Sequence, residues 1–290
     1  MNDEQKKMLN WRQLFPERGF AHSMALRKCN RFEFFKPRDD AESILSERKR
    51  WLAQSPELFV TLEKRAIPFW PRVVTTVAEC REGVIDDYFN PPTSYDVVLN
   101  ECIDWTGRND VDWVLLGLGR HKIYQMVAGG VCFPSNWDVR DKIGQPVNTI
   151  HGPVPGLNRA LAIQINRFFH ELPIFGFWQR ENWGLSADAE LNHHPTRILK
   201  GLGANATLST TWIRLERQFF CKLGGRDEFD MPILFCIRVY NYLLSDVVKG
   251  PGAAARIAHA LETMPDDVAA YKGIAPARAG LIAQLKAVSL

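Results

Sequence analysis

The chain has 290 residues, 46% hydrophobic and 24% charged, which is typical of a globular protein that can bury a full core. Its formal net charge of +3, from 36 basic and 33 acidic residues, is too balanced to indicate a nucleic-acid or membrane surface. No apolar run reaches the roughly 18 residues of a membrane span, and the charged start MNDEQKKMLNW lacks the apolar core of a secretion signal. We therefore expect a cytoplasmic protein with no nucleic-acid or membrane partner.

The first third of the chain predicts an irregular arm followed by two helices. Residues 11–38 mix aromatic and basic side chains without a period, so we expect an arm that lies on the domain. Two aspartates offer an N-cap for a helix over residues 39–54. A proline in its favoured first-turn position opens a second helix over residues 68–82, and NPPTS at 90–94 predicts a turn.

The middle of the chain changes to β-rich patterns. Residues 112–119 and 121–133 predict a β-hairpin that turns at Gly119–Arg120. A short helix over residues 137–144 is expected, capped by Ser135–Asn136 and closed by Gly144, and the apolar spacing of 157–172 predicts an amphipathic helix.

The last part of the sequence predicts a sheet and a helical tail. Residues 176–185, 210–223 and 232–244 read as strands, and the last two show clear period-two patterning, so we expect a central antiparallel sheet. Beyond residue 250, two short alanine-rich helical patterns, 253–264 and 275–288, predict a peripheral helical extension.

The segment 132–156, CFPSNWDVRDKIGQPVNTIHGPVPG, cannot be one long helix because its prolines remove backbone donors and fix φ. His151 precedes Pro153 in a context that favours extended backbone. A histidine on such a stiff segment would have a fixed aim and would be easily kept neutral for a metal. The alternative is a structural loop whose histidine forms a capping hydrogen bond, and the motif alone leaves both open.

Arginines inside apolar strand patterns are the second unusual feature, since a buried charge without a partner is costly. Four of them, Arg180, Arg214, Arg217 and Arg238, need either an internal acid such as Glu216 or the carboxylates of a ligand. A buried Arg–Glu network is one interpretation. The other combines a rigid histidine, these arginines and 17 phenylalanines with nine tryptophans into a haem pocket.

The sequence gives little support to a cysteine-based metal site or to other common catalytic motifs. The six cysteines form no CxxC pair, which argues against a zinc ribbon, an iron–sulfur cluster or a disulfide framework, so we interpret several of them as small core residues. The sequence contains no phosphate loop, dinucleotide fingerprint, GxSxG or HExxH motif.

A set of motifs in a fixed order resembles the haem-dependent oxidative N-demethylase α-subunit family. These motifs are the segment 132–156, FAHSMALRK (20–28), RENWGL (180–185), RLERQ (214–218) and LFCIRVY (234–240). The resemblance implies an α+β fold with a PAS-like antiparallel sheet and flanking helices. We expect an N-terminal arm with helices (1–110), a haem-binding core (111–245) and a C-terminal helical extension (246–290).

The resemblance also implies an activity. Family enzymes remove a methyl group from a secondary amine with O₂ and release formaldehyde. Haem b is the cofactor, and NADPH-derived electrons arrive through flavin and iron–sulfur centres that this chain does not bind. We therefore expect an oxidoreductase, a monooxygenase of a small amine or related nitrogen compound, with a separate reductase subunit.

Carried over residue by residue, His151 corresponds to the proximal haem ligand, and at least one of Arg214, Arg217 and Arg238 would pair with a haem propionate. Arg180, in the RxNW motif, would wall the pocket or merely cap the sheet. Glu216 is either the partner of a cationic amine or an acid in an internal salt bridge with arginine.

The chain departs from the family pattern after RLERQ, where KLGGRDEFDMP replaces a connection through Leu-Pro, and this leaves the substrate open. Two further classes stay possible at this point. One is a haem-based gas or redox sensor, or a haem-binding module without catalysis, and the other is a haem-free structural homologue.

Overall fold

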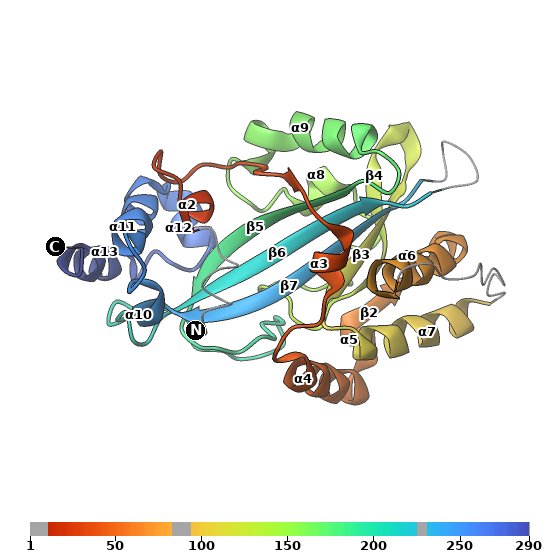
Figure 1. Ribbon diagram of the computed structural model, residues 1–290, viewed down its shortest axis with the longest axis horizontal. Helices are drawn as coiled ribbons and strands as arrows, with labels where there is room; N and C mark the ends of the chain where they lie inside the picture. The colour runs from red at the N-terminus through yellow and green to blue at the C-terminus, as the bar shows by residue number, and fades with distance from the viewer. Residues whose placement is uncertain (1–10, 83–93, 225–230, 290) are drawn as a thin grey trace.

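An antiparallel sheet forms the centre of the molecule, seen in a computed structural model that describes residues 11–82, 94–224 and 231–289 (Figure 1). Within these residues seven strands pair in the order β1-β5-β6-β7-β3-β4-β2, and every neighbouring pair is antiparallel. The strands are β1 (Arg27–Lys28), β2 (Val60–Leu62), β3 (Asp112–Leu118), β4 (Tyr124–Gly130), β5 (Phe177–Ser186), β6 (Trp212–Lys222) and β7 (Ile233–Leu243). The expected α+β class is confirmed, and the finer PAS-like assignment stays a prediction.

Helices surround this sheet. They are α2 (Trp11–Leu14), α3 (Arg31–Phe35), α4 (Ala41–Gln54), α5 (Pro56–Phe59), α6 (Trp70–Glu82), α7 (Tyr95–Arg108), α8 (Val147–Ile150), α9 (Leu157–Glu171), α10 (Leu244–Val247), α11 (Ala253–Thr263), α12 (Asp266–Tyr271) and α13 (Arg278–Ala287). Two 3₁₀ turns, Lys64–Phe69 and Arg120–Lys122, complete the described elements. None of the described helices combines the length and apolarity that a membrane crossing requires.

The long strands β5, β6 and β7 present two different faces, because successive side chains of a strand point to opposite sides. We call one the α9 face, because Phe220 packs against Phe168 and Phe169 of α9. The strand register places Trp178, Arg180, Asn182, Gly184, Arg214, Glu216, Gln218 and Phe220 on it. The opposite side, the α6 face, carries Glu181, Trp183, Arg217, Phe219 and Arg238.

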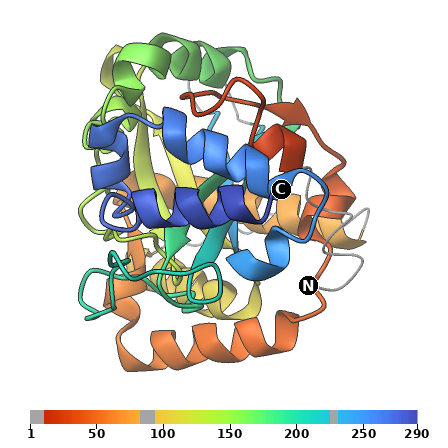
Figure 2. The same cartoon turned by 90° about the vertical axis from the view of Figure 1, so that its left-hand side faces the viewer.

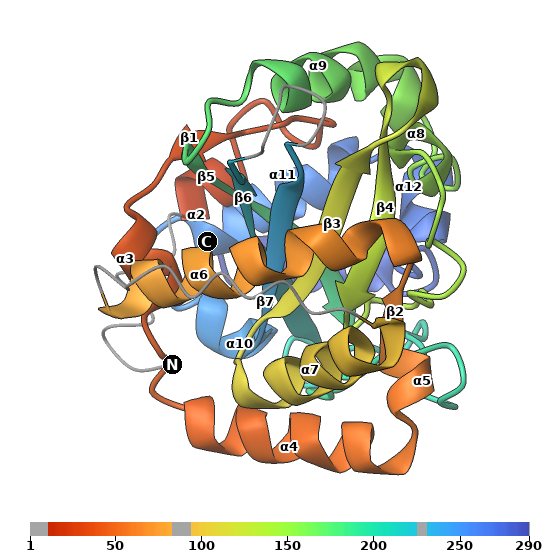
Figure 3. The same cartoon turned by 90° about the vertical axis from the view of Figure 1, so that its right-hand side faces the viewer.

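Separate apolar clusters cover the two faces. On the α6 face, Phe219 lies in a core shared with helices α3, α6 and α7, and α6 crosses β3 and β7 in Figure 3. Farther along the same face, Trp183 packs in a cluster built mainly by α2 and α11 to α13, which stand in front of the sheet end in Figure 2. Helices α8 and α9 cover the other side around Phe220.

Several predicted elements are confirmed: the hairpin β3–β4, the helix α9, the three long strands and the two tail helices. The helix predicted at 68–82 begins at Trp70, because Pro68 lies in the preceding 3₁₀ turn. Asp40 precedes α4 as predicted, but its carboxylate pairs with Arg38 instead of capping the helix. Most of the turn predicted at 90–94 lies outside the described residues.

The helix predicted over residues 137–144 is wrong. This stretch forms consecutive turns, in which the carboxylate of Asp138 accepts hydrogen bonds from the backbone and side chain of Arg140. Aspartate that binds nearby backbone in this way competes with helix formation. Gly144, which was predicted to close this helix, has a φ of 75° and lies at the end of the turns instead.

The N-terminal region is less irregular than predicted. Strand β1 pairs with β5 at one edge of the described sheet, and β2 pairs with β4 at the other. The first 110 residues therefore contribute both edge strands as well as helices. The division at residues 110 and 245 stays a prediction. Five cysteines are buried and Cys29 is partly buried, which agrees with their interpretation as small core residues.

Candidate functional site

His151 directly follows the one-turn helix α8, whose first residue comes after Pro146. Its backbone is helical (φ −82°, ψ −9°), so the predicted extended conformation is wrong. Pro153 and Pro155 cannot continue the helix because they lack an N–H group. The chain turns instead, and Gly156, with a φ of 71°, leads into α9.

Hydrogen bonds within the loop, and one from the N-terminal arm, hold the loop that carries His151. The amide of His151 donates to Val147 O at 3.0 Å, and its own carbonyl accepts from Val154 N at 3.0 Å. From the N-terminal arm, His22 Nε2 donates to Pro155 O at 2.8 Å. His22 belongs to the FAHSMALRK motif, so this contact joins two of the motifs that the sequence singled out.

The His151 ring is largely buried and lines a pocket of about 250 Å³ between α8, α9 and the start of β4. Burial, with the nearby charges of Arg180 and Lys142, lowers the pKa of His151 to about 4. The ring is therefore neutral near neutral pH, which is the form that binds a metal. Its buried Nδ1 has no hydrogen-bond partner in the part of the chain that the structure describes.

Arg180 is the one predicted arginine that acts electrostatically on His151. Burial lowers the pKa of Arg180, and Glu216 and Glu181 partly oppose this effect. Its buried Nε has no hydrogen-bond partner, and the guanidinium makes no ion pair with any described residue. A buried guanidinium in this state is suited to a carboxylate that the protein itself does not supply.

Glu216 lies beside Arg180 on the α9 face, because Asn182 is its register partner on β5. One carboxylate oxygen accepts from Ser135 Oγ at 2.6 Å. The other accepts from Gln218 Nε2 at 2.9 Å and from Asn182 Nδ2 at 3.4 Å. All three donors are neutral, so among the described residues Glu216 has no direct salt bridge of the kind that the alternative interpretation predicted.

Arg214 lies on the same face, but its guanidinium N–H groups already form hydrogen bonds within the protein. Its Nε donates to Ser135 Oγ at 2.8 Å, and its two terminal nitrogens donate to the carbonyls of Phe133, Glu190 and Leu191 at 2.8–3.1 Å. The side chain is 5% exposed. Arg214 therefore ties two loops to the sheet, and the expectation that at least one of Arg214, Arg217 and Arg238 pairs with a propionate stays a prediction.

Arg217 and Arg238 are on the α6 face, across the sheet from His151. Arg217 lies 3.6 Å from Glu181, which also binds Arg27. Arg238 donates to Asp110 at 2.9 Å, and both side chains are almost completely buried. Internal acids hold these two arginines on the side of the sheet away from His151, and their predicted role at the cofactor stays a prediction.

Two candidate functional residues, Ser135 and Lys272, were not predicted from the sequence. Ser135, whose hydroxyl joins Arg214 to Glu216, lay inside the 132–156 segment but was interpreted only as a helix cap. Lys272, after α12, donates through Nζ to Trp183 O at 2.7 Å. Burial lowers the pKa of Lys272, Glu216 opposes this effect, and Arg180 adds to it. No motif pointed to Lys272, and only the folded chain brings it to β5.

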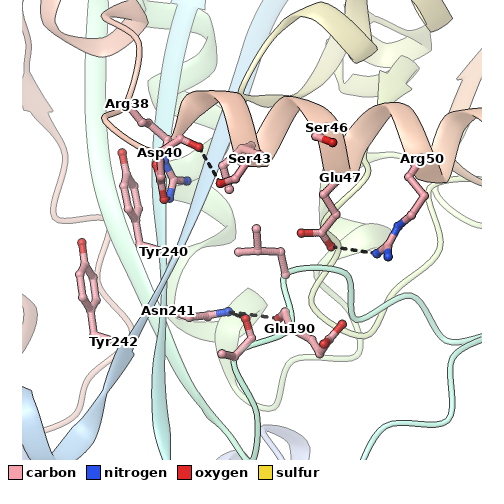
Figure 4. A pocket seen from close by; sticks show the side chains of 13 residues that line it. Arg38, Asp40, Ser43, Ser46, Glu47, Arg50, Glu190, Tyr240, Asn241 and Tyr242 are labelled. Carbon is pink, nitrogen blue, oxygen red and sulfur yellow. Dashed lines mark hydrogen bonds and ion pairs between the residues drawn. The ribbon is translucent and has the colours of Figure 1, made fainter.

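A larger groove of about 610 Å³ lies between α4, β7 and residues 189–191 (Figure 4). Its charges are paired with one another: Arg38 with Asp40 at 2.7 Å, and Arg50 with Glu47 at 3.9 Å. Asn241 donates to the Glu190 carbonyl at 3.1 Å. The groove therefore gathers no uncompensated charge, in contrast to the surroundings of Arg180.

The residues on the α9 face fit a haem. They provide a neutral imidazole with an unpartnered buried nitrogen and a buried guanidinium without an acid. On the same face of β5, a Cβ on Gly184 would meet open space within 4 Å. His151 would ligate the iron, and Arg180 would hold a carboxylate of the macrocycle.

Comparison with known families agrees with this chemistry. The sequence matches the model of a family described as haem-dependent oxidative N-demethylase, alpha subunit-like, over residues 84–282. This range is more than half of the 290 residues and includes His151, Arg180, Glu216 and Lys272. The description names a haem-dependent oxidative N-demethylase and an alpha subunit. The chain belongs to the haem-dependent oxidative N-demethylase alpha subunit-like family.

Proposed function

We propose that this protein is a haem b monooxygenase that acts on a small amine, by oxidative N-demethylation or a closely related oxidation. Within this proposal the sheet and its helices serve as a PAS-like haem domain. A separate reductase subunit delivers NADPH-derived electrons through flavin and iron–sulfur centres. One observation carries the proposal: a neutral, largely buried His151, whose Nδ1 has no hydrogen-bond partner among the described residues, lies close to Arg180, which makes no ion pair with any of them.

Bound haem would supply the iron that takes up O₂. In the overall reaction one oxygen atom oxidises the N-methyl carbon, which leaves as formaldehyde, and the other oxygen atom leaves as water. The electrons and protons for this water come from the reductase and the solvent. The protein's part is to ligate the iron through a neutral imidazole, to bind the amine and to keep bulk water away from the reacting atoms.

Glu216 is the residue we assign to the amine. Its carboxylate is fixed by three neutral donors from Ser135, Asn182 and Gln218, which leaves its charge available to a cation. A protonated amine donates N–H groups, and hydrogen bonds between oppositely charged groups are the strong ones. Glu216 would therefore hold the substrate by its ammonium group.

A haem spectrum of two variants tests the proposal. The protein expressed with a haem precursor should show a Soret band, and His151→Ala should abolish or shift it. His170→Ala is the matched control, since His170 lies exposed on α9 and its ring donates to the Lys122 carbonyl and contacts Tyr124. A wild-type protein without a Soret band would contradict haem binding, and an unchanged spectrum in His151→Ala would assign the iron to another ligand.

Turnover separates an enzyme from a haem sensor. With a chemical or enzymatic reductant, the holoprotein should release formaldehyde from a panel of N-methylated amines, and Glu216→Gln should weaken amine binding. No formaldehyde from any amine of the panel would count against the demethylase and would favour a module that binds haem without catalysis.

A further inference from the structure

Lys272 brings the C-terminal extension to the candidate site. It follows α12, whose buried residues Val268 and Ala269 pack into the cluster of C-terminal helices. Its Nζ donates to Trp183 O at 2.7 Å and lies 5.7 Å from the centroid of the Trp183 ring. The extension that the sequence predicted as peripheral therefore places an amine against β5, the strand that carries Arg180.

Lys272 and Arg180 approach the same stretch of β5. Trp183 is three residues beyond Arg180, and a strand rises about 3.3 Å per residue, so the two points lie about 10 Å apart along the strand. Glu216 is close enough to raise the pKa of both Arg180 and Lys272 against the effect of burial. Neither of them makes an ion pair with a residue that the structure describes, within 4.0 Å.

The local charge balance is positive. Glu216 is the acid that offsets both partly buried cations, Arg180 and Lys272. Its carboxylate accepts hydrogen bonds from three neutral groups. Arg214 adds a further positive charge, which is partly offset by Glu216, Asp112 and Asp188. Partly buried cations without ion-pair partners are costly unless a ligand brings compensating negative charge. The surroundings of Glu216, from the α9 face to the β5 backbone at Trp183, are thus suited to a ligand with more than one carboxylate.

We propose that Lys272 and Arg180 together hold the two carboxylates of the haem. The proposal rests on the haem binding proposed above and extends it to a residue outside every motif. Each propionate would take one cation in a charge-assisted hydrogen bond. Once both cations are neutralised, the charge of Glu216 is no longer offset by them and becomes available to a protonated amine. Cofactor binding would therefore prepare the substrate site.

The test compares haem with haem dimethyl ester, in which both carboxylates are blocked. Affinities are measured by titrating haem-free wild type, Lys272→Gln, Lys272→Arg and the control Lys249→Gln, whose side chain is 75% exposed. We expect Lys272→Gln to weaken haem binding by about tenfold, as for a lost hydrogen bond between charged groups. The same variant should bind the dimethyl ester as wild type does, and Lys272→Arg should retain most of the haem affinity.

Other outcomes would overturn the inference. An equal loss for haem and its dimethyl ester would mean that Lys272 only supports the structure, through Trp183. Thermal unfolding with inorganic phosphate distinguishes a free anion from the cofactor. Stabilisation by phosphate that requires Lys272, together with haem affinity that does not, would assign the two cations to a free anion.

The inference and the proposed function can fail separately. If wild type binds haem through His151 but Lys272→Gln has unchanged haem affinity, the carboxylate assignment is wrong and the haem protein remains. If wild type binds neither haem nor its dimethyl ester, the proposed function itself is wrong.

Discussion

The two faces of the central sheet both carry arginines but partner them differently. On the α6 face, Arg217 lies beside Glu181 and Arg238 beside Asp110, so internal acids compensate the charges. On the α9 face, Arg180 has no acid within ion-pair distance among the described residues, and Glu216 is bound by neutral donors only. On the α6 face internal acids compensate the arginines, whereas on the α9 face a ligand could pair with the charges of Arg180 and Glu216.

This difference separates structural arginines from functional ones better than residue type does. Arg217 and Glu216 are neighbours in the sequence, yet they point to opposite sides because a strand alternates its side chains. The four arginines were grouped by residue type, but the sheet places Arg217 and Arg238 on the face opposite to Arg180 and Arg214. The position of the acid decides which arginine is free to act on a cofactor.

The largest expected effect comes from breaking a pair on the α6 face. Arg238→Met would leave the buried Asp110 without one of its cations, and removal of one partner of a buried ion pair typically costs about 3–5 kcal/mol. Urea unfolding of the haem-free protein measures this loss. Haem affinity of the folded variant should stay at the wild-type value, because Arg238 lies across the sheet from His151.

Arg108→Met is the control for that experiment. Arg108 pairs with Asp104 at 3.0 Å, but their side chains are 71% and 57% exposed, and such surface pairs contribute little. A similar, small loss in both variants would contradict the structural role that we give to the α6 face.

The second prediction concerns pH and the α9 face. The unfolded chain binds a proton at His151 near pH 6.5, whereas the folded chain does so only near pH 4. Stability of the haem-free protein should therefore fall as pH decreases through this window and level off below it, because both states are then protonated. At about 1.4 kcal/mol per pH unit the loss is at most about 3.5 kcal/mol.

Unfolding curves for wild type and His151→Gln at several pH values isolate this contribution, since other groups titrate in both proteins. The difference between the two curves should decrease as pH falls through the window. A constant difference would show that His151 is not held neutral by burial.

Arg180→Met provides the third and most direct comparison of the two faces. Removal of a guanidinium that has no internal acid should leave the stability of the haem-free protein unchanged or raise it, in contrast to Arg238→Met. Haem affinity should fall by about tenfold, as expected for one hydrogen bond to a charged group. Destabilisation equal to that of Arg238→Met would mean that the two faces do not differ in the way we describe.

Much of the fold could be predicted because long periodic segments carry a strong signal. The helix α9 and the strands β6 and β7 were read from their spacing alone. Strands β1 and β2, with two and three residues, are too short to show a period. The helix α7 was missed although a signal existed, since Ser94 caps it and Val98 and Cys102 share its buried face.

The site was predictable only in part. The period-two pattern of β6 already places Glu216 and Arg217 on opposite faces, so the sequence held enough information to separate them. Pairing across strands is different, because the neighbourhood of Arg180 and Glu216 depends on the register of β5 with β6. Lys272 required the complete fold, since its contact with Trp183 joins segments 89 residues apart.

The smallest predicted effect tests how the α9 face keeps Glu216 away from direct pairing with arginine. Ser135 Oγ accepts from Arg214 Nε, which can only donate, so its own proton must go to Glu216. Ser135→Ala removes both bonds and should cost about 1 kcal/mol of stability, with amine affinity of the holoprotein about fivefold weaker. Ser135→Thr keeps the hydroxyl and should behave as wild type in urea unfolding and in amine titrations of the Soret band. Amine affinity that is unchanged in Ser135→Ala would show that the orientation of Glu216 does not depend on this bridge, and Asn182 and Gln218 would then suffice to hold its carboxylate.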